Sequence, residues 1–349
     1  MLYSLVEMNR AAMAPLRLTA KAASTFWGSP ANPASSSQFA RSITAGAKVF
    51  ERATRYYGKP DWQIETTEID GLPHAVTPNT VWGSPWCQLV RFDIEGVDTE
   101  SRPDLIIVAP LSGHYATLLR GTVEAFLPTH NVHITDWTDA RMAPVWLGRF
   151  DLDDYIDHIR DMLGFLGAGA HVLAVCQPGP PVLAAISMMA EDGSASLPAT
   201  MTFMGSPIDA RRSPTVPNKL AEERSLDWFR SKMIHSVPLP WPGAGRSVYP
   251  GFIQLSSFMH MNWDRHVDAQ ARFFDHLVEG DEDGADKHKT FYDEYLSVLD
   301  LTEEFYIQTI ERVFQKALLA RGEYRYRDER LVKPQAIKTV GLMTVEGEL

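Results

Sequence analysis

One stretch decides the fold of this chain: His171-Val172-Leu173-Ala174-Val175-Cys176-Gln177-Pro178-Gly179-Pro180-Pro181-Val182-Leu183-Ala184-Ala185-Ile186. It begins as a short apolar run, breaks abruptly at Cys176 and resumes as an Ala-rich apolar segment that is typical of a helix. A strand, a tight turn and a helix in this order form a nucleophile elbow, which presents the side chain at the turn to substrate. The pattern therefore makes Cys176 a candidate nucleophile.

A nucleophile elbow needs small residues two positions before and after the nucleophile, because the strand and the helix pack closely there. Ala174 and Pro178 occupy these positions in place of the usual glycines. The backbone N–H of Gln177 is expected to be one oxyanion-hole donor, and the positive end of the following helix is expected to favour the thiolate of Cys176. The alternative interpretation is that Cys176 is a small buried apolar residue, the commoner role of an isolated cysteine.

Length and composition place the chain among large globular proteins. Its 349 residues are 45% hydrophobic, enough for one large domain with an insertion or for two domains. The net charge of −11 argues against a nucleic-acid partner, because phosphate binding needs clustered Lys and Arg. No apolar run has the length of a transmembrane span and no secretory signal opens the chain, so we expect a cytoplasmic protein. The two cysteines, Cys87 and Cys176, form no disulfide framework, and the sequence has no metal-binding spacing.

From residue 104 onward the sequence alternates short apolar runs with amphipathic stretches. Four apolar runs are typical of strands covered on both faces of a parallel sheet, and they span residues 105–110, 132–135, 171–175 and 200–204. Amphipathic stretches between them, at 116–127 and 152–166, are long enough to return across the sheet as helices. The predicted fold class is therefore α/β, with a mostly parallel sheet flanked by helices. In such sheets the site lies at the carboxyl ends of the strands, where Cys176 falls.

Polar turns follow three other predicted strands. The turn after the first strand lies where lipases and esterases place their second oxyanion donor, and the candidates there are Ser112, Gly113 and His114. The turns after two further strands carry side chains that we expect to support the residues touching substrate, namely Asp136, Trp137 and Asp209.

Outside the alternating region the sequence predicts mainly helices. The expected division is an N-terminal helical segment, a first part of the core, an inserted helical cap and the start of a last core part, at residues 1–58, 59–212, 213–330 and 331–349. Within the cap, either Asp300 or Thr302 is expected to begin the final helix, and Gly322 is expected to end it. A helical cap rich in aromatic residues can present apolar surface to an oily substrate.

Five motifs carry a resemblance to a known family: Val175-Cys176-Gln177-Pro178, the run from Ala109-Pro110-Leu111-Ser112-Gly113-His114-Tyr115 to Val123, His133-Ile134-Thr135-Asp136-Trp137, Asp139-Ala140-Arg141, and Met204-Gly205-Ser206-Pro207-Ile208-Asp209. They resemble the intracellular poly(3-hydroxybutyrate) depolymerases, and the resemblance covers essentially the whole chain. It implies an α/β-hydrolase fold with an inserted lid, and a nucleophilic Cys176 working with an Asp and a His on the storage polymer of bacterial granules. Water would resolve the acyl thioester, or coenzyme A in some members, and no other cofactor is implied.

The sequence departs from the α/β-hydrolase order in one respect. In that order the acid and the histidine follow the nucleophile, on turns after the last strands, whereas all eleven histidines here precede residue 289. We therefore expect the triad Asp and His beyond Leu349. On this interpretation the chain is a C-terminally shortened form of a longer protein, and the shortened chain would itself be inactive. The alternative is a complete chain that recruits Asp209 with His114 or His260.

Two other functions are open from the sequence. Polyhydroxyalkanoate synthases also carry a cysteine elbow and would build the polymer from 3-hydroxyacyl-coenzyme A, although the Gln-Pro pair after Cys176 favours the depolymerase. The third possibility is a non-catalytic granule-associated protein. For each of them the expected partners are the granule polymer and its surface, and the sequence carries no signal for the oligomeric state.

Overall fold

The computed structural model describes residues 2–212, 214 and 216–347. Contacts divide the chain into two compact units, one formed by the residues up to Pro60 with Gly251–Val298, and the other by Asp61–Pro250 with the residues from Leu299 onward. This division differs from the expected one, because only 251–298 of the expected cap 213–330 separates from the unit that holds the sheet. Residues after 298 return to that unit, where the N–H of Leu299 donates to the carbonyl of Gly113 at 2.8 Å.

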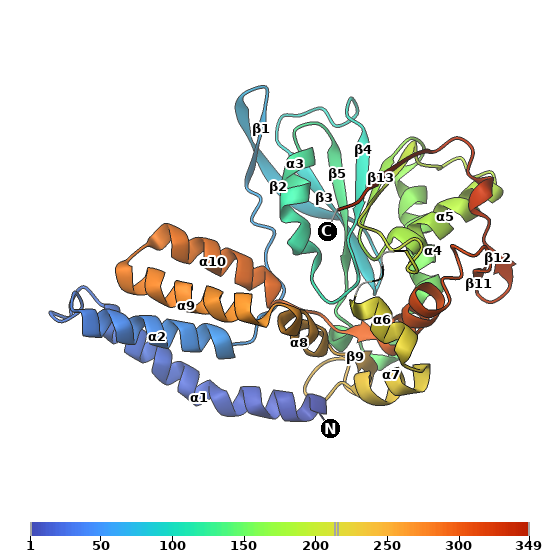
Figure 1. The fold of residues 1–349 in the computed structure, drawn as a ribbon. Coiled ribbons are helices and arrows are strands. Elements are labelled where there is room, and N and C mark those ends of the chain that lie inside the picture. Colours follow the sequence, from blue (N-terminus) through green and yellow to red (C-terminus); the bar gives the residue numbers. More distant parts are fainter. Residues whose placement is uncertain (1, 213, 215, 348–349) are drawn as a thin grey trace. The chain divides into compact units, whose positions relative to one another are not determined.

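An eight-stranded sheet forms the centre of the larger unit (Figure 1), in the order β1-β2-β3-β5-β4-β6-β7-β13. Its strands are β1 (Thr66–Ile69), β2 (Leu72–Gly83), β3 (Cys87–Ile94), β4 (Asp104–Val108), β5 (Asn131–Trp137), β6 (His171–Val175), β7 (Thr200–Met204) and β13 (Gly341–Val345). β3 is antiparallel to both its neighbours, β2 and β5, whereas the strands from β5 to β13 along the sheet are parallel. A mostly parallel sheet of this order, with antiparallel pairing from β1 to β5 at one edge, is the α/β-hydrolase fold, as predicted.

The central strands are apolar because both of their faces are covered. In β4 the side chains of Ile106, Ile107 and Val108 are fully buried. The helices that follow the strands are α3 (Arg120–Phe126), preceded by the 3₁₀ turn η1 (Ala116–Leu119), then α4 (Leu152–Leu166) and α5 (Gly179–Glu191). α4 has the predicted bounds, because a capping box of Asp151 and Asp154 fixes its start.

The rest of the larger unit consists of short elements. They are η2 (Ala140–Met142), η3 (Val145–Leu147), α6 (Val216–Glu223), α7 (Leu226–Met233), β8 (His235–Ser236), β9 (Ser247–Tyr249), β10 (Leu301–Thr302), α11 (Glu303–Gln308), the π-helical η4 (Thr309–Gln315), β11 (Arg325–Tyr326), β12 (Arg330–Leu331) and η5 (Pro334–Ala336). Thr302 caps α11 as predicted, but the helical stretch ends at Gln315 and does not reach Gly322. It stops there because the N–H of Leu318 closes a wide turn onto the carbonyl of Arg312, and Ala317 takes a positive φ.

The smaller unit is entirely helical. It contains α1 (Leu2–Gly28), α2 (Gln38–Thr54), α8 (Gly251–Met261), α9 (Trp263–Glu279) and α10 (Glu282–Tyr295). α1 packs on α2, α2 on α9 and α9 on α10. Ser37 caps α2 by accepting from the N–H of Ala40. Among the described residues, no helix combines the length and the hydropathy that a membrane span requires.

Candidate active site

Cys176 lies at a sharp turn between β6 and α5. Its φ is +65°, a left-handed conformation that costs energy for any residue with a side chain. Two hydrogen bonds hold the turn: the N–H of Cys176 donates to the carbonyl of Met204 at 2.8 Å, and the N–H of Gly179 donates to the carbonyl of Cys176 at 3.3 Å. The side chain is exposed. A strained residue that presents its side chain between a central strand and a helix is the geometry of a nucleophile elbow.

The turn after β7 approaches the elbow closely at Gly179. A Cβ atom at Gly179 would lie 2.4 Å from the Cβ of Ser206 and 2.7 Å from its Oγ. Ser206 belongs to the turn after β7, and its hydroxyl donates to the carbonyl of Ala174 at 3.3 Å. The first residue of α5 therefore has to be glycine, because the helix starts against the next strand's turn.

The loop after β4 lies against the elbow, as predicted. β4 and β6 are parallel neighbours with Val108 opposite Ala174, and the sheet order reverses between them, so both strands end at the point where α/β sheets bind ligands. The N–H of Leu111 donates to Oε1 of Gln177 at 3.0 Å and joins the loop to the elbow.

The same loop contains backbone N–H groups that can donate to a bound ligand. Gly113 has a φ of +109°, which glycine adopts readily. Within the part of the chain that the structure describes, the amides of Ser112 and Gly113 donate no hydrogen bond, whereas His114 is buried. These two amides remain available to an oxygen of a bound substrate.

The thiol of Cys176 is less acidic than the sequence led us to expect. Loss of water around the sulfur raises the pKa of Cys176, and the hydrogen bond from the backbone N–H of Gln177, which lowers the pKa, does not compensate. The Gln177 amide, expected to point into a cavity, is directed at this sulfur. No histidine among the described residues forms a hydrogen bond with it. The helix end alone therefore does not produce a thiolate.

The alternative acid, Asp209, is already paired. Both of its oxygens accept from the guanidinium of Arg211, at 2.7 and 2.8 Å. These hydrogen bonds lower the pKa of Asp209 to about 2. His114 lies in the loop after β4, and His260 lies in α8, which belongs to the other compact unit. The structure provides no contact that joins Asp209 to either histidine among the residues it describes.

Trp137 and Asp136 end β5 beside the site, and both are buried. The indole N–H of Trp137 donates to the carbonyl of Ala109 at 2.9 Å. Its ring stacks on Tyr155 with centroids 4.1 Å apart. Trp137 therefore holds the carbonyl of Ala109, at the start of the loop after β4.

Asp139 connects the turns around the site, and the sequence indicated it only as part of a family motif. Its carboxylate is buried and accepts from Nε of Arg141 at 2.6 Å. It also accepts from the N–H of Asp300 at 3.0 Å and the hydroxyl of Tyr115 at 3.1 Å. A buried charge is tolerated only when paired in this way. Asp139 therefore ties the turns after β4 and β5 to β10.

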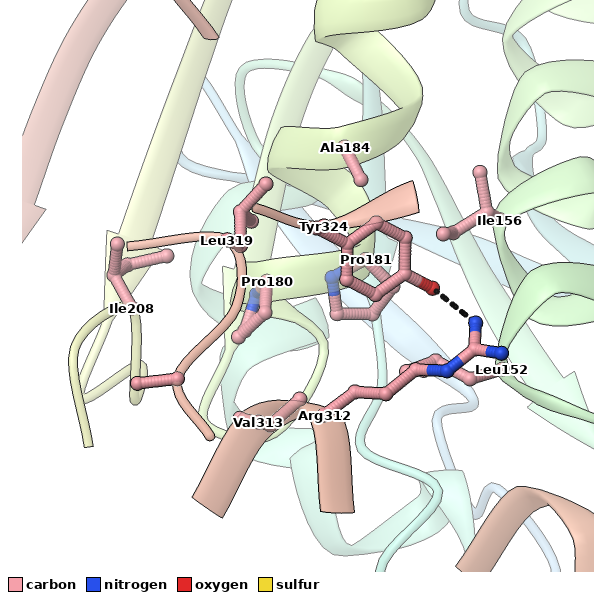
Figure 2. Close-up of a pocket in the computed structure, with 11 residues that line it drawn as sticks. Leu152, Ile156, Pro180, Pro181, Ala184, Ile208, Arg312, Val313, Leu319 and Tyr324 are labelled. Carbon is pink, nitrogen blue, oxygen red and sulfur yellow. Dashed lines mark hydrogen bonds between the residues drawn. The ribbon is translucent and has the colours of Figure 1, made fainter. Parts of the chain in front are cut away.

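Figure 2 shows the void behind α5, lined by Pro180, Pro181 and Ile156 from one side. Its volume is about 10 Å³, room for at most one water molecule. On the other side, Arg312 pairs with Asp153 at 2.8 Å, and the charge of Asp153 raises the pKa of Arg312 even though burial lowers it. This void is part of the packing of the elbow helix and cannot hold a substrate.

Comparison with family models finds a match in the C-terminal part of the chain. Residues 205–349 match the family model described as "PHB de-polymerase C-terminus", where PHB is poly(3-hydroxybutyrate). The matched residues begin directly after β7 and include Ser206, Asp209 and β13, whereas Cys176 precedes them.

Solved structures with similar folds include two lipolytic enzymes. Brefeldin A esterase, a bacterial homologue of human hormone sensitive lipase, is 14% identical over 54% of this chain and 54% of its own, with a TM-score of 0.32. The monoacylglycerol lipase of Paleococcus ferrophilus is 12% identical over 70% of this chain and 86% of its own, with a TM-score of 0.33. Our chain thus spans about half the length of the esterase. Scores this low carry no argument, and a comparison with curated proteins finds no match.

The described residues near the strand ends include a thiol and several hydrogen-bond donors. Among the described residues, no group of three His, Cys, Asp or Glu side chains is placed to hold a metal ion. The groups that the structure brings together near the strand ends are the thiol of Cys176, the side chain of Gln177 and the amides of Ser112 and Gly113.

Proposed function

We propose that this protein hydrolyses the ester bonds of poly(3-hydroxybutyrate) through a thioester on Cys176 and releases 3-hydroxybutyrate oligomers or monomers. The observation that carries the proposal is the positive φ of Cys176 at the end of a central strand, in a chain that matches a PHB depolymerase model. Strain of this kind persists where the surrounding structure holds a functional side chain in place.

The reaction has two steps. The sulfur of Cys176 attacks an ester carbonyl, and the tetrahedral oxyanion forms beside the amides of Ser112 and Gly113. The intermediate then expels the alcohol end of the departing chain, which takes up a proton. Water attacks the resulting 3-hydroxyacyl thioester, releases the acid and returns the thiol. Coenzyme A in place of water would give the 3-hydroxyacyl-coenzyme A. The base that removes the thiol proton is not among the contacts of Cys176, and we assign that role to the Asp and His pair implied by the family resemblance.

Exposed apolar side chains in the same unit supply a surface for the polymer. Trp146 is 81% exposed and Leu239 is 82% exposed. Arg246 belongs to the same segment as Leu239 and joins it to the loop that carries Trp146. Its guanidinium donates to the carbonyls of Ala143 and Gly148, at 2.9 and 2.7 Å. Large exposed apolar groups of this kind mark interaction sites, and a polyester surface in a storage granule is the partner that we propose, in the cytoplasm.

The proposal is tested by incubating the protein with amorphous polymer granules and assaying free 3-hydroxybutyrate. Cys176→Ala should reduce release by at least about a thousandfold, since loss of a nucleophile leaves only weak residual catalysis. Cys87→Ala is the matched control, because Cys87 is fully buried in β3. Equal release by the Cys176→Ala variant would contradict the proposal.

The raised thiol pKa and the lack of a described base favour a second candidate, a non-catalytic granule-associated protein. In that case the protein would bind granules without releasing 3-hydroxybutyrate, and Cys176→Ser would change neither property. Formation of polymer from 3-hydroxyacyl-coenzyme A, with release of free thiol, would indicate a synthase instead.

A further inference from the structure

A groove between α9 and α10 in the helical unit has no role in the chemistry of Cys176. Its volume is about 530 Å³, within the range of small-molecule binding sites. Figure 1 shows the two helices side by side. The residues that line this groove include no carboxylate, although the protein as a whole carries a net charge of −11.

Three cations line the groove: Arg265, Arg272 and Lys287. All three are exposed, and among the described residues none of them forms an ion pair or a side-chain hydrogen bond. By contrast, other cations of this unit are paired, as Arg52 is with Asp293 at 2.7 Å. Cations that face a concave surface without any carboxylate create a positive potential that attracts an anion.

The three cations are placed at two ends of the groove. Arg272 lies close enough to His288 for its charge to lower the pKa of that ring, and Lys287 precedes His288 in α10. Arg265 is two turns earlier in α9, about 10 Å along the helix. Its neighbour His266 lies 5.0 Å from the ring of Tyr295 between centroids. An extended ligand could therefore place its anionic end on Arg272 and Lys287.

Aromatic rings also line the groove. His288 stacks between Phe273 and Tyr292, with centroids 4.2 and 4.4 Å away. Phe291 stacks on Tyr295 at 5.4 Å and is itself 53% exposed. An exposed ring beside cations is a platform on which a planar base can stack.

We propose that this groove binds a nucleoside polyphosphate, with its base against Phe291 and its phosphates against Arg272 and Lys287. An acyl chain would use the rings but leave the three cations without a partner. A small inorganic anion would use the cations but leave Phe291 exposed. A flat lipid surface would not enter a concave site. Only a ligand with both a planar ring and several negative charges uses the whole groove.

Isothermal titration calorimetry of the intact protein with ATP tests the proposal. We expect a dissociation constant in the micromolar range. Arg272→Ala and Phe291→Ala should each weaken binding about tenfold or more, since each removes one of the two kinds of contact. Both side chains are exposed, so circular dichroism should show an unchanged fold. Arg41→Ala is the matched control, because Arg41 is an exposed arginine of the same unit outside the groove.

Adenosine and pyrophosphate serve as half-ligands in the same experiment. Each should bind at least about tenfold more weakly than ATP, because each engages only the rings or only the cations. No binding of ATP at millimolar concentration, or equal affinity in Arg272→Ala, would overturn the proposal. Pyrophosphate binding as tightly as ATP, or ATP binding unchanged in Phe291→Ala, would also overturn it, since the base would then contribute nothing.

Discussion

The packing around the elbow leaves no room for a side chain at Gly179. Any side chain there would overlap Ser206, with a Cβ-to-Cβ distance of 2.4 Å. We predict that Gly179→Ala lowers the free energy of unfolding by about 1–3 kcal/mol, the usual cost of overpacking a core. Chemical denaturation measures the loss, and Ser206→Gly in the same chain should restore part of it. An unchanged unfolding midpoint in the single variant would show that α5 can shift away from the turn after β7.

Cys176 combines an exposed side chain with a thiol that is mostly protonated at neutral pH. Because its pKa is raised above the ordinary value, the thiolate fraction is small at pH 7 and grows only as pH rises. We predict slow alkylation by iodoacetamide at pH 7, with a rate that still increases above about pH 8.5, the ordinary cysteine pKa. Cys176→Ser provides the blank, and Cys87 should stay unlabelled because it is buried. A rate that levels off below pH 7 would mean that an unseen group activates the thiol.

At the level of single residues, the sequence allowed the positions of Cys176, the loop 112–114 and Trp137 at strand ends to be predicted, because each lies at the end of a recognisable strand. The hydrogen bonds that Asp139 accepts could not be predicted in the same way. Its partners, Arg141, Tyr115 and Asp300, come from turns that are far apart in the chain and meet only in the folded state.

Among the elements, the strands and helices with strong periodicity were the predictable ones. β4, β6 and β7 are short apolar runs because both faces are covered, and α4 carries its own cap. β2 was harder to predict, because most of its twelve residues are exposed and two are prolines, so it shows no alternation. The π-helical end of the last helix was also missed. Within it, Arg312 pairs with Asp153 of α4, a contact between distant parts of the chain that local periodicity does not reveal.

The loop after β5 carries a highly exposed tryptophan, Trp146. Trp146 has little packing to lose, since it is 81% exposed. We predict that Trp146→Ala reduces 3-hydroxybutyrate release from granules about tenfold, while hydrolysis of a soluble ester such as p-nitrophenyl butyrate stays unchanged. Val267→Ala, on an exposed side chain of the helical unit, is the control. A parallel loss on both substrates would place Trp146 in the chemistry rather than at the polymer surface.

For the whole molecule, the edge of the sheet at β13 affects the state of association. β13 pairs with β7 on one side only among the described strands, and its Leu342 and Met343 are 60% and 58% exposed. An apolar strand edge of this kind pairs readily with other chains. We predict that the protein associates as its concentration rises, and that Met343→Lys reduces the association. Size-exclusion chromatography with light scattering measures both, and a monomer at every concentration would contradict the prediction.

Intact-mass analysis of the acid-quenched protein after incubation with p-nitrophenyl 3-hydroxybutyrate is the most direct test of Cys176 as the nucleophile. Acid traps a thioester, because it stops the attack of water on the acyl intermediate. We predict the addition of a single 3-hydroxybutyryl group, located on the peptide that contains Cys176 and missing from the Cys176→Ala variant. Addition of the same group to the Cys176→Ala variant, or to another residue of the unaltered protein, would contradict the assignment.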